Sequence, residues 1–290
     1  MKKKVFVLGS INRDISIEAK NFPQEGETVN GEGFKMSLGG KGANQSIALL
    51  KAGADVSLLG KVGKDEFGKS IVKTLSDYGL PIDSISISDS YNTGIAIIVL
   101  HNNNNRIILS HGANYDLKEK DVISFLKQAN AGDYFLSQYE NEPETTAFAF
   151  KKAKEKGLIT VWNPSPIADY PNDLLSYIDI LVLNETEGKE ILEKEGKGDL
   201  QELGVSRIVL TLGDKGSISY SKKEVIRVPA KKIEPIDTTG AGDTFLGFFL
   251  ASLSNGKEAK ESLEIATKAS ALACLKRGAS EAIPLLEDIR

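Results

Sequence analysis

The chain has 290 residues, of which 41% are hydrophobic and 26% charged, and its formal net charge is −4 at pH 7. This length supports one large hydrophobic core, the acidic balance argues against a nucleic-acid partner, and no apolar run is long enough to span a membrane. One cysteine and two histidines are too few for a disulfide framework, a thiolate metal cluster or a histidine-built zinc site. We therefore expect a cytoplasmic protein whose acid–base chemistry depends on carboxylates.

The first predicted element is a short apolar strand at residues 5–8. Its apolar run is too short for the core of an export signal, and Gly9 and the polar residues that follow interrupt it. Asn12 and Asp14 come just past this strand, at the carboxyl end where open α/β sheets bind ligands. An amide and a carboxylate at this place suit the hydroxyl groups of a sugar.

Three further segments of the first hundred or so residues are predicted to be extended, namely 28–38, 94–100 and 106–110. An Asn-rich turn at 102–105 joins the last two. We expect these segments to form a small β-sheet lid, built from about 12–38 and 93–110. Because no low-complexity linker or repeat divides the sequence, residues 1–290 are predicted to form a single domain.

A glycine-rich cluster occupies residues 39–45, between an extended segment and a predicted helix over 43–52. Exposed backbone N–H groups and the cation of Lys41 are available there to a polar ligand. On its own, the cluster is equally compatible with a tight turn.

Residues 63–70 formally match the P-loop pattern G-x-x-x-x-G-K-[ST] and follow a predicted strand at 56–61. The apolar residues of this region follow helical spacing, which places Lys69 inside a helix, and Asp65 is positioned to cap that helix. The N–H groups that a phosphate would need are then already used, so we reject a P-loop.

From about residue 119 onward, short apolar strands alternate with helical patterns. Strands are predicted at 134–137, 159–162, 180–183 and 208–212, and helices after Pro143 and from Glu185. This alternation is typical of a parallel sheet covered by helices. Two long helical patterns, 243–254 and 258–274, close the chain.

The segment Asp237-Thr-Thr-Gly-Ala-Gly-Asp243 directly precedes a strongly apolar helix. Gly240, Ala241 and Gly242 are therefore predicted to lie where unpaired N–H groups gather and where the helix dipole favours negative charge. We interpret them as an anion hole for a transferring phosphoryl group. Asp243 alone would serve equally well as a helix cap, but beside an anion hole it is placed to take the proton of an acceptor hydroxyl.

Five motifs occur in the order in which they occur in the ribokinase, or PfkB, family of carbohydrate kinases, which the whole chain resembles. They are residues 9–14, 39–45, 184–187, 211–213 and 237–245. The resemblance implies a three-layer α/β/α sandwich with a central, mostly parallel sheet and a small β-sheet lid. It also implies an ATP-dependent kinase with D-ribose as the favoured acceptor, phosphorylated at O5 to ribose 5-phosphate.

The resemblance implies functions for residues at the matching positions, with Asp243 as the base and Gly240, Ala241 and Gly242 as the anion hole. Sugar contacts are implied for Asn12, Asp14, Gly40, Lys41, Asn44, Glu140 and Asp243. Nucleotide contacts are implied for Asn184, Thr211, Gly213, Asp214, Gly216, Gly242 and Thr267, the last standing where relatives usually carry Asn or His. Magnesium is implied near Glu187, through water, and a monovalent cation, expected to be potassium, at Asp237, Thr239, Ala273, Lys276, Gly278 and Ala282.

Two alternative functions stay open from the sequence. A related kinase acting on fructose, a nucleoside or another small sugar would share the catalytic motif and differ in the lid and in residues 12–14. A sugar-binding sensor without catalysis is the other, although binding alone would not need a base. Because family members often pair through the lid and exposed strand edges seldom stay unpaired, we also expect a homodimer.

Overall fold

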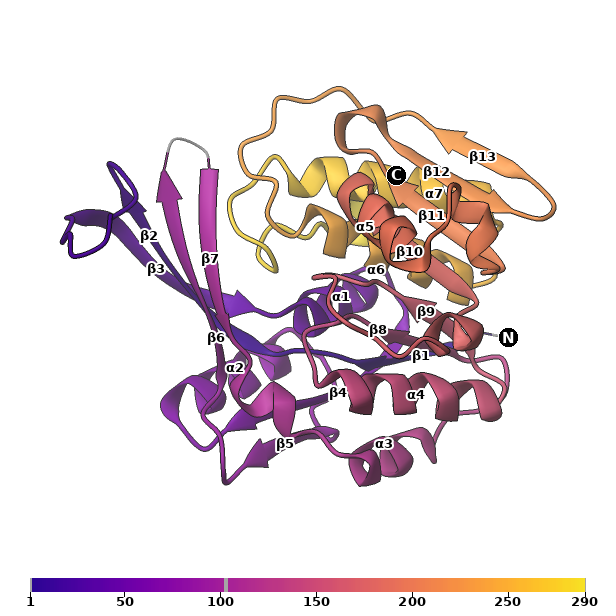
Figure 1. The fold of residues 1–290 in the computed structure, drawn as a ribbon, viewed down its shortest axis with the longest axis horizontal. Coiled ribbons are helices and arrows are strands. Elements are labelled where there is room, and N and C mark those ends of the chain that lie inside the picture. The colour runs from indigo at the N-terminus through magenta and orange to yellow at the C-terminus, as the bar shows by residue number, and fades with distance from the viewer. Residues whose placement is uncertain (1, 102–103, 290) are drawn as a thin grey trace.

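The computed structural model describes residues 2–101 and 104–289, so the turn expected at 102–105 lies partly outside the described residues. Figure 1 shows a large body in which helices cover a central sheet, and a small sheet of four strands that projects from one side of it. In the described part of the chain, no helix is long and apolar enough to cross a membrane.

The central sheet contains nine strands. In spatial order they are β13 (Val225–Val228), β12 (Ser217–Ser221), β11 (Arg207–Thr211), β10 (Ile180–Asn184), β9 (Ile159–Trp162), β8 (Tyr134–Ser137), β1 (Lys4–Leu8), β4 (Asp55–Gly63) and β5 (Ile85–Ser88). Neighbours from β11 to β5 run parallel, whereas β12 pairs antiparallel with both of its neighbours. The mostly parallel sheet expected from the alternating pattern is confirmed.

Helices lie on both faces of this sheet, which gives the three layers. They are α1 (Lys41–Lys51), α2 (Glu66–Asp77), α3 (Glu119–Leu126), α4 (Pro143–Glu155), α5 (Glu185–Glu195), α6 (Ala241–Ser254) and α7 (Ala259–Ala273). Strand β1 separates two hydrophobic cores, because Val5 and Val7 pack with α1, α2, α6 and α7, while Phe6 and Leu8 pack with α3, α4 and α5. Successive side chains of a strand point to opposite faces, so a wholly apolar strand serves both cores.

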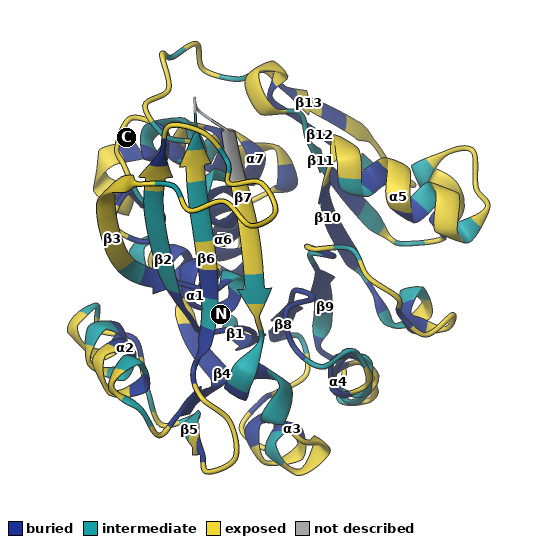
Figure 2. Ribbon diagram, turned by 60° about the vertical axis from the view of Figure 1, so that its left-hand side comes forward, coloured by how far each residue is buried: buried dark blue, intermediate teal, exposed yellow. Residues whose placement is uncertain are grey.

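The small sheet has the order β3 (Gly31–Gly39), β2 (Asn12–Ala19), β6 (Gly94–His101) and β7 (Asn104–Ser110). Strand β2 pairs parallel with β6, and the other two pairs are antiparallel. Figure 2 shows that β3 and β7, the edge strands, are mostly exposed. Since β2 begins four residues after β1 ends, the sheet is attached where β1 reaches its carboxyl end.

Two helix boundaries differ from the sequence predictions. Helix α1 begins at Lys41 rather than at residue 43, and α6 begins at Ala241 rather than at 243. Glycine is a poor helix former, so propensity delays the predicted start. Close packing explains the earlier start of α1, because a Cβ atom at Gly42 would lie 2.4 Å from the carbonyl carbon of Gly9.

Residues 66–77 form α2, and the side chain of Asp65 caps it by accepting a hydrogen bond from the Gly68 N–H at 2.8 Å. Lys69 lies in the first turns of this helix and pairs with Glu66 at 2.7 Å. The helical interpretation of the P-loop-like segment is confirmed.

Candidate active site

Asp243 lies in the first turn of α6, and the residue is only 7% exposed. Gln45 Nε2 donates to its Oδ1 at 2.8 Å, and Asn44 Nδ2 donates to its Oδ2 at 3.2 Å. Both donors come from α1, which packs closely against α6: a Cβ atom at Gly247 would lie 2.3 Å from that of Ala48. The packing of these two helices therefore fixes the orientation of the carboxylate.

The donor Gln45 is itself held by other buried amides. Its Oε1 accepts from Gln138 Nε2 at 2.7 Å, and its Nε2 also donates to Asn163 Oδ1 at 3.0 Å. Asn163 Nδ2 in turn donates to the Val182 carbonyl at 3.0 Å. Sequence reasoning did not assign Gln45, Gln138 or Asn163, although Gln45 ends the glycine-rich cluster and Gln138 lies two residues before Glu140.

Asn12 and Asp14 lie on β2, where the small sheet meets the body. Asn12 Oδ1 accepts from Asn114 Nδ2 at 2.7 Å, and Asn114 Oδ1 accepts from the Ile11 N–H at 2.9 Å. Asn114 is only 1% exposed and was not assigned from the sequence, because its partners are about a hundred residues away. It fixes the amide of Asn12 in one orientation.

Asp14 belongs to a cluster of carboxylates. Burial, followed by the charges of Glu140, Asp243 and Glu281, raises its pKa from 3.8 to about 7. The structure thus brings Glu140 and Asp243 within electrostatic reach of Asp14. Gly39 makes room for this carboxylate, since a Cβ atom there would lie 1.9 Å from Asp14 Oδ1.

Glu140 is anchored beside the start of α1. Its Oε2 accepts from Ser10 Oγ at 2.5 Å and from the Lys41 backbone N–H at 3.2 Å. Burial alone would lower the pKa of the Lys41 ammonium, but the charges of Asp243, Glu140 and Glu187 raise it, and the net shift is upward. Gly40 caps α1 with φ of 90°, a left-handed conformation that favours glycine. Ser10 was not assigned from the sequence.

A cavity of about 430 Å³ opens on the other side of Asp243, at the carboxyl ends of β10 and β11. Its lining includes the predicted nucleotide residues Asn184, Thr211, Gly213 and Gly242, together with Lys41, Glu187 and Asp243. Three other predicted nucleotide residues, Asp214, Gly216 and Thr267, do not line it. Thr267 is buried, and its hydroxyl lies 3.5 Å from that of Ser217.

One backbone amide of the predicted anion hole already has a hydrogen-bond partner within the protein. Gly240 adopts a left-handed conformation with φ of 72°, and the Ala241 N–H donates to the Thr238 carbonyl at 3.2 Å. The prediction of an unpaired amide is therefore wrong for Ala241, because the chain forms a tight turn before the helix. Gly242 faces open space, since a Cβ atom there would meet no atom within 4 Å, and it borders the cavity.

Asn184 and Glu187 form a capping box at the start of α5. Asn184 Oδ1 accepts from the Glu187 N–H, and Glu187 Oε2 accepts from the Asn184 N–H, both at 2.9 Å. This satisfies two N–H groups at the N-terminus of the helix. Both residues also line the cavity, so the structural role and a role toward a ligand are compatible.

Two of the predicted monovalent-cation residues, Thr239 and Gly278, contact Asp237. Its Oδ1 accepts from the Thr239 N–H and its Oδ2 from the Gly278 N–H, both at 2.9 Å. Burial opposes ionisation of this carboxyl, but these hydrogen bonds prevail and lower its pKa. Within residues 2–101 and 104–289, no three His, Cys, Asp or Glu side chains cluster as a metal site. The carboxylate of Asp237 offers hard oxygen atoms, the ligand type that hard cations prefer.

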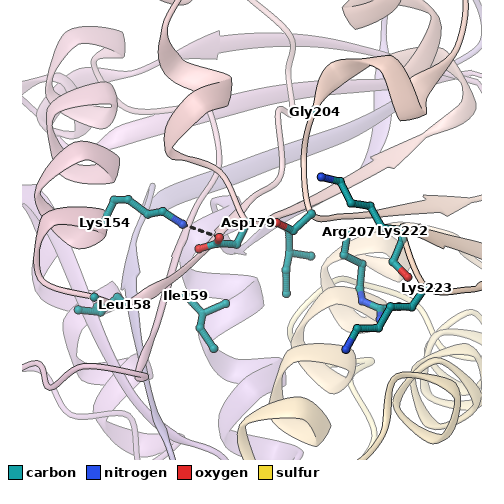
Figure 3. A pocket seen from close by; sticks show the side chains of 12 residues that line it. Lys154, Leu158, Ile159, Asp179, Gly204, Arg207, Lys222 and Lys223 are labelled. Atoms are coloured by element: carbon teal, nitrogen blue, oxygen red, sulfur yellow. Dashed lines mark hydrogen bonds and ion pairs between the residues drawn. The ribbon is translucent and has the colours of Figure 1, made fainter.

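A second cavity, of about 690 Å³, lies at the opposite edge of the sheet, at the amino ends of β9, β10 and β11. Figure 3 shows Lys154 pointing toward Asp179 there, and the two form an ion pair of 2.5 Å. Arg207, also in the lining, pairs with Glu224 at 3.4 Å. Among the described lining residues, Asp179 is the only carboxylate, and Lys154 already pairs with it. Because open α/β sheets bind their ligands at the carboxyl ends of the strands, the smaller cavity is the candidate active site.

A family model described as "pfkB family carbohydrate kinase" matches residues 2–286. The chain belongs to the pfkB family of carbohydrate kinases. It is therefore an ATP-dependent sugar kinase, a phosphotransferase whose acceptor is an alcohol group. The family assignment made from the five motifs is confirmed.

Named relatives extend over the same length. A ribokinase of Lactococcus lactis is 33% identical, and the match covers 99% of this chain and 96% of the relative. The crystal structure of a ribokinase from Thermotoga maritima is similar with a TM-score of 0.90 at 30% identity, covering 99% of this chain and 98% of the other. A ribokinase of Arabidopsis thaliana, solved in complex with ribose and ATP, matches with a TM-score of 0.88 at 29% identity, covering 100% and 98%.

Proposed function

We propose that the protein phosphorylates the O5 hydroxyl of D-ribose with ATP, and that Asp243 is the general base. The observation that carries this proposal is the place of Asp243 between two environments. Its carboxylate accepts a hydrogen bond from Asn44 and lies within electrostatic reach of Asp14, which Glu140 also influences, and it lines the cavity at the ends of β10 and β11. The similar ribokinase of Arabidopsis thaliana was solved with ribose and ATP together, which supports ribose as the acceptor.

The sugar is proposed to bind under the small sheet, which acts as a lid. Asn12, Asp14, Asn44 and Glu140 offer amide and carboxylate groups to its hydroxyls, with Gly40 and Lys41 beside them. Asn44 Oδ1 is buried and has no hydrogen-bond partner in the described part of the chain, so it is available to a sugar hydroxyl. A buried acceptor without a partner is unfavourable, and a bound hydroxyl would satisfy it.

In the proposed transfer step, Asp243 acts on a sugar hydroxyl next to a nucleotide bound in the cavity. Its carboxylate takes the proton of the O5 hydroxyl while O5 forms a bond to the γ-phosphorus, and the bond from that phosphorus to the bridging oxygen breaks to release ADP. The amide of Gly242, the N-terminus of α6 and the Lys41 ammonium stabilise the negative charge on the phosphoryl oxygens. The nucleotide is proposed to bind in the adjacent cavity, against Asn184, Thr211 and Gly213. It is also proposed to contact three residues that do not line this cavity, namely Asp214, Gly216 and Thr267.

Two ions, magnesium and potassium, are proposed to bind near the reacting groups. Magnesium, when bound with the nucleotide, offsets phosphate charge, and Glu187 would hold its water shell from the cavity wall. Potassium fits the Asp237 carboxylate with the backbone oxygens of the predicted set, Thr239, Ala273, Lys276, Gly278 and Ala282. The support is the position of Asp237, which is tied to both the loop of the anion hole and the loop after α7.

The small sheet is also proposed to form a homodimer interface. Met36, Ile15, Ile97 and Ile108 are register partners across its four strands, so their side chains share one face, opposite to that of Asp14. Met36, Ile97 and Ile108 are 48%, 38% and 68% exposed. A second copy would cover this apolar row, and sedimentation at micromolar concentration should give the mass of a dimer.

A substrate panel tests the acceptor. ADP release with Mg-ATP is measured for ribose, deoxyribose, fructose and adenosine, each with and without potassium. The proposal predicts the highest kcat/KM for ribose, a phosphorylated product at O5, and a clear increase with potassium. A higher kcat/KM for fructose or a nucleoside would assign the related kinase instead, and binding of ribose without turnover would assign a sensor.

A further inference from the structure

Lys51, the last residue of α1, lies far along that helix from the residues assigned to catalysis. Its Nζ donates to the carbonyl oxygens of Ser280 at 3.2 Å and Ile283 at 2.9 Å, and lies 5.1 Å from the centre of the Tyr78 ring. In the part of the chain that the structure describes, this ammonium forms no ion pair. Lys51 therefore joins the C-terminal end of α1 to residues 280–283, which are distant in sequence.

The two carbonyls belong to the segment 274–285, which follows α7 and contains no helix or strand. The other side of this segment touches the turn before α6. Asp237 Oδ2 accepts from the Gly278 N–H at 2.9 Å, and the Cys274 carbonyl accepts from the Asp237 N–H at 3.2 Å. A Cβ atom at Gly240 would lie 3.0 Å from Ala279. The segment therefore supports the turn that leads into the anion hole.

The opposite end of α1 holds the proposed base. Asn44 and Gln45 donate to the two oxygens of Asp243, and Asn44 is seven residues, or about 10 Å of helix, before Lys51. A single rigid helix thus contacts the carboxylate directly at one end and the segment behind Gly240 at the other. Both halves of the transfer step take their position from α1.

We infer that Lys51 is a positioning residue for phosphoryl transfer: it fixes the segment 278–283 against Gly240 and so sets the anion hole relative to Asp243. This inference rests on the proposed function of Asp243 and Gly242. Lys51 is not among the residues that line the cavity, and its hydrogen bonds go to Ser280 and Ile283, so we expect it to act through the segment that it holds.

Lys156 provides a matched control. It caps the C-terminus of α4, and its Nζ donates to the carbonyls of Leu126 and Lys127, so it too is a half-buried lysine that joins a helix end to another segment. That segment follows α3, in the other hydrophobic core. Loss of Lys156 should lower the melting temperature. It should not change kcat, because Lys156 contacts no residue assigned to the transfer step.

The test compares Lys51→Met, Lys51→Arg and Lys156→Met. We expect Lys51→Met to lower kcat about 10-fold or more while the KM for the sugar changes less than about 2-fold, and Lys51→Arg to restore most of the rate, because a guanidinium also donates to two carbonyls. Lys156→Met should keep the wild-type kcat. Wild-type kcat in Lys51→Met, or an equal loss in both methionine variants, would overturn the inference.

Hydrogen exchange gives a readout that does not need turnover. Lys51→Met should speed amide exchange in residues 238–244 relative to the wild type, whereas Lys156→Met should leave it unchanged. Unchanged exchange there in Lys51→Met would also overturn the inference. If the wild-type protein turned over none of the sugars, the proposed function would be wrong. Failure of the proposed function can therefore be distinguished from failure of the inference about Lys51.

Discussion

Replacement of Asp14 by asparagine should change how stability depends on pH. Burial, followed by the charges of Glu140, Asp243 and Glu281, raises the pKa of Asp14 from 3.8 to about 7 in the folded protein. Between these two values the folded state binds a proton that the unfolded state has lost, so the free energy of unfolding falls as pH rises from about 4 to about 7. At about 1.4 kcal/mol per pKa unit, the carboxylate destabilises the fold by up to about 4 kcal/mol above pH 7.

Asparagine keeps the shape of the side chain and carries no charge. Asp14→Asn should therefore equal the wild type in stability near pH 4 and exceed it by up to about 4 kcal/mol at pH 8. Urea unfolding at several pH values between 4 and 8 measures this, with Asp83→Asn, a change at an exposed carboxylate, as the control. If Asp14→Asn had the wild-type pH dependence, the raised pKa of Asp14 in the folded protein would be refuted.

Two further substitutions test the geometry around the site. Gly39→Ala should raise the KM for the sugar about 10-fold or more, because the new methyl group would displace the Asp14 carboxylate, whereas Gly198→Ala, in open space, should have no effect. An unchanged KM in Gly39→Ala would show that the position of the Asp14 carboxylate does not matter for sugar binding. Gln45→Leu removes the 2.8 Å hydrogen bond to Asp243 Oδ1 and should lower kcat about 10- to 100-fold, the usual value of a hydrogen bond to a charged group. A change confined to the KM for ATP would show that Gln45 does not orient the base.

Much of the fold could be predicted from the sequence because its signals are local. The strands of the second half are short apolar runs, and α2 carries its own cap in Asp65, so spacing and capping suffice. The errors fall where glycines dominate, at the starts of α1 and α6. At α1, the backbone of Gly42 approaches that of Gly9 closely, and helix propensity does not account for such a tertiary contact.

The candidate site could be predicted only in its outline. The motifs identified Asp243, Asp14 and Asn44, but not the amides that hold them. Gln138 meets Gln45 across 93 residues of sequence, and Asn114 meets Asn12 across 102. Such contacts depend on how the strands and helices pack in three dimensions. The sequence around one amide side chain does not indicate which distant residue it will bind.

The most direct test of the central claim is the turnover number of Asp243→Asn. Asparagine retains the size of the side chain and can still be held by Gln45, but it cannot accept the proton of the sugar hydroxyl. We expect kcat with ribose and Mg-ATP to fall about 10²- to 10⁴-fold in this variant, while the affinity for ribose, measured by calorimetry, changes little. A kcat within a few-fold of the wild type would contradict the assignment of Asp243 as the general base.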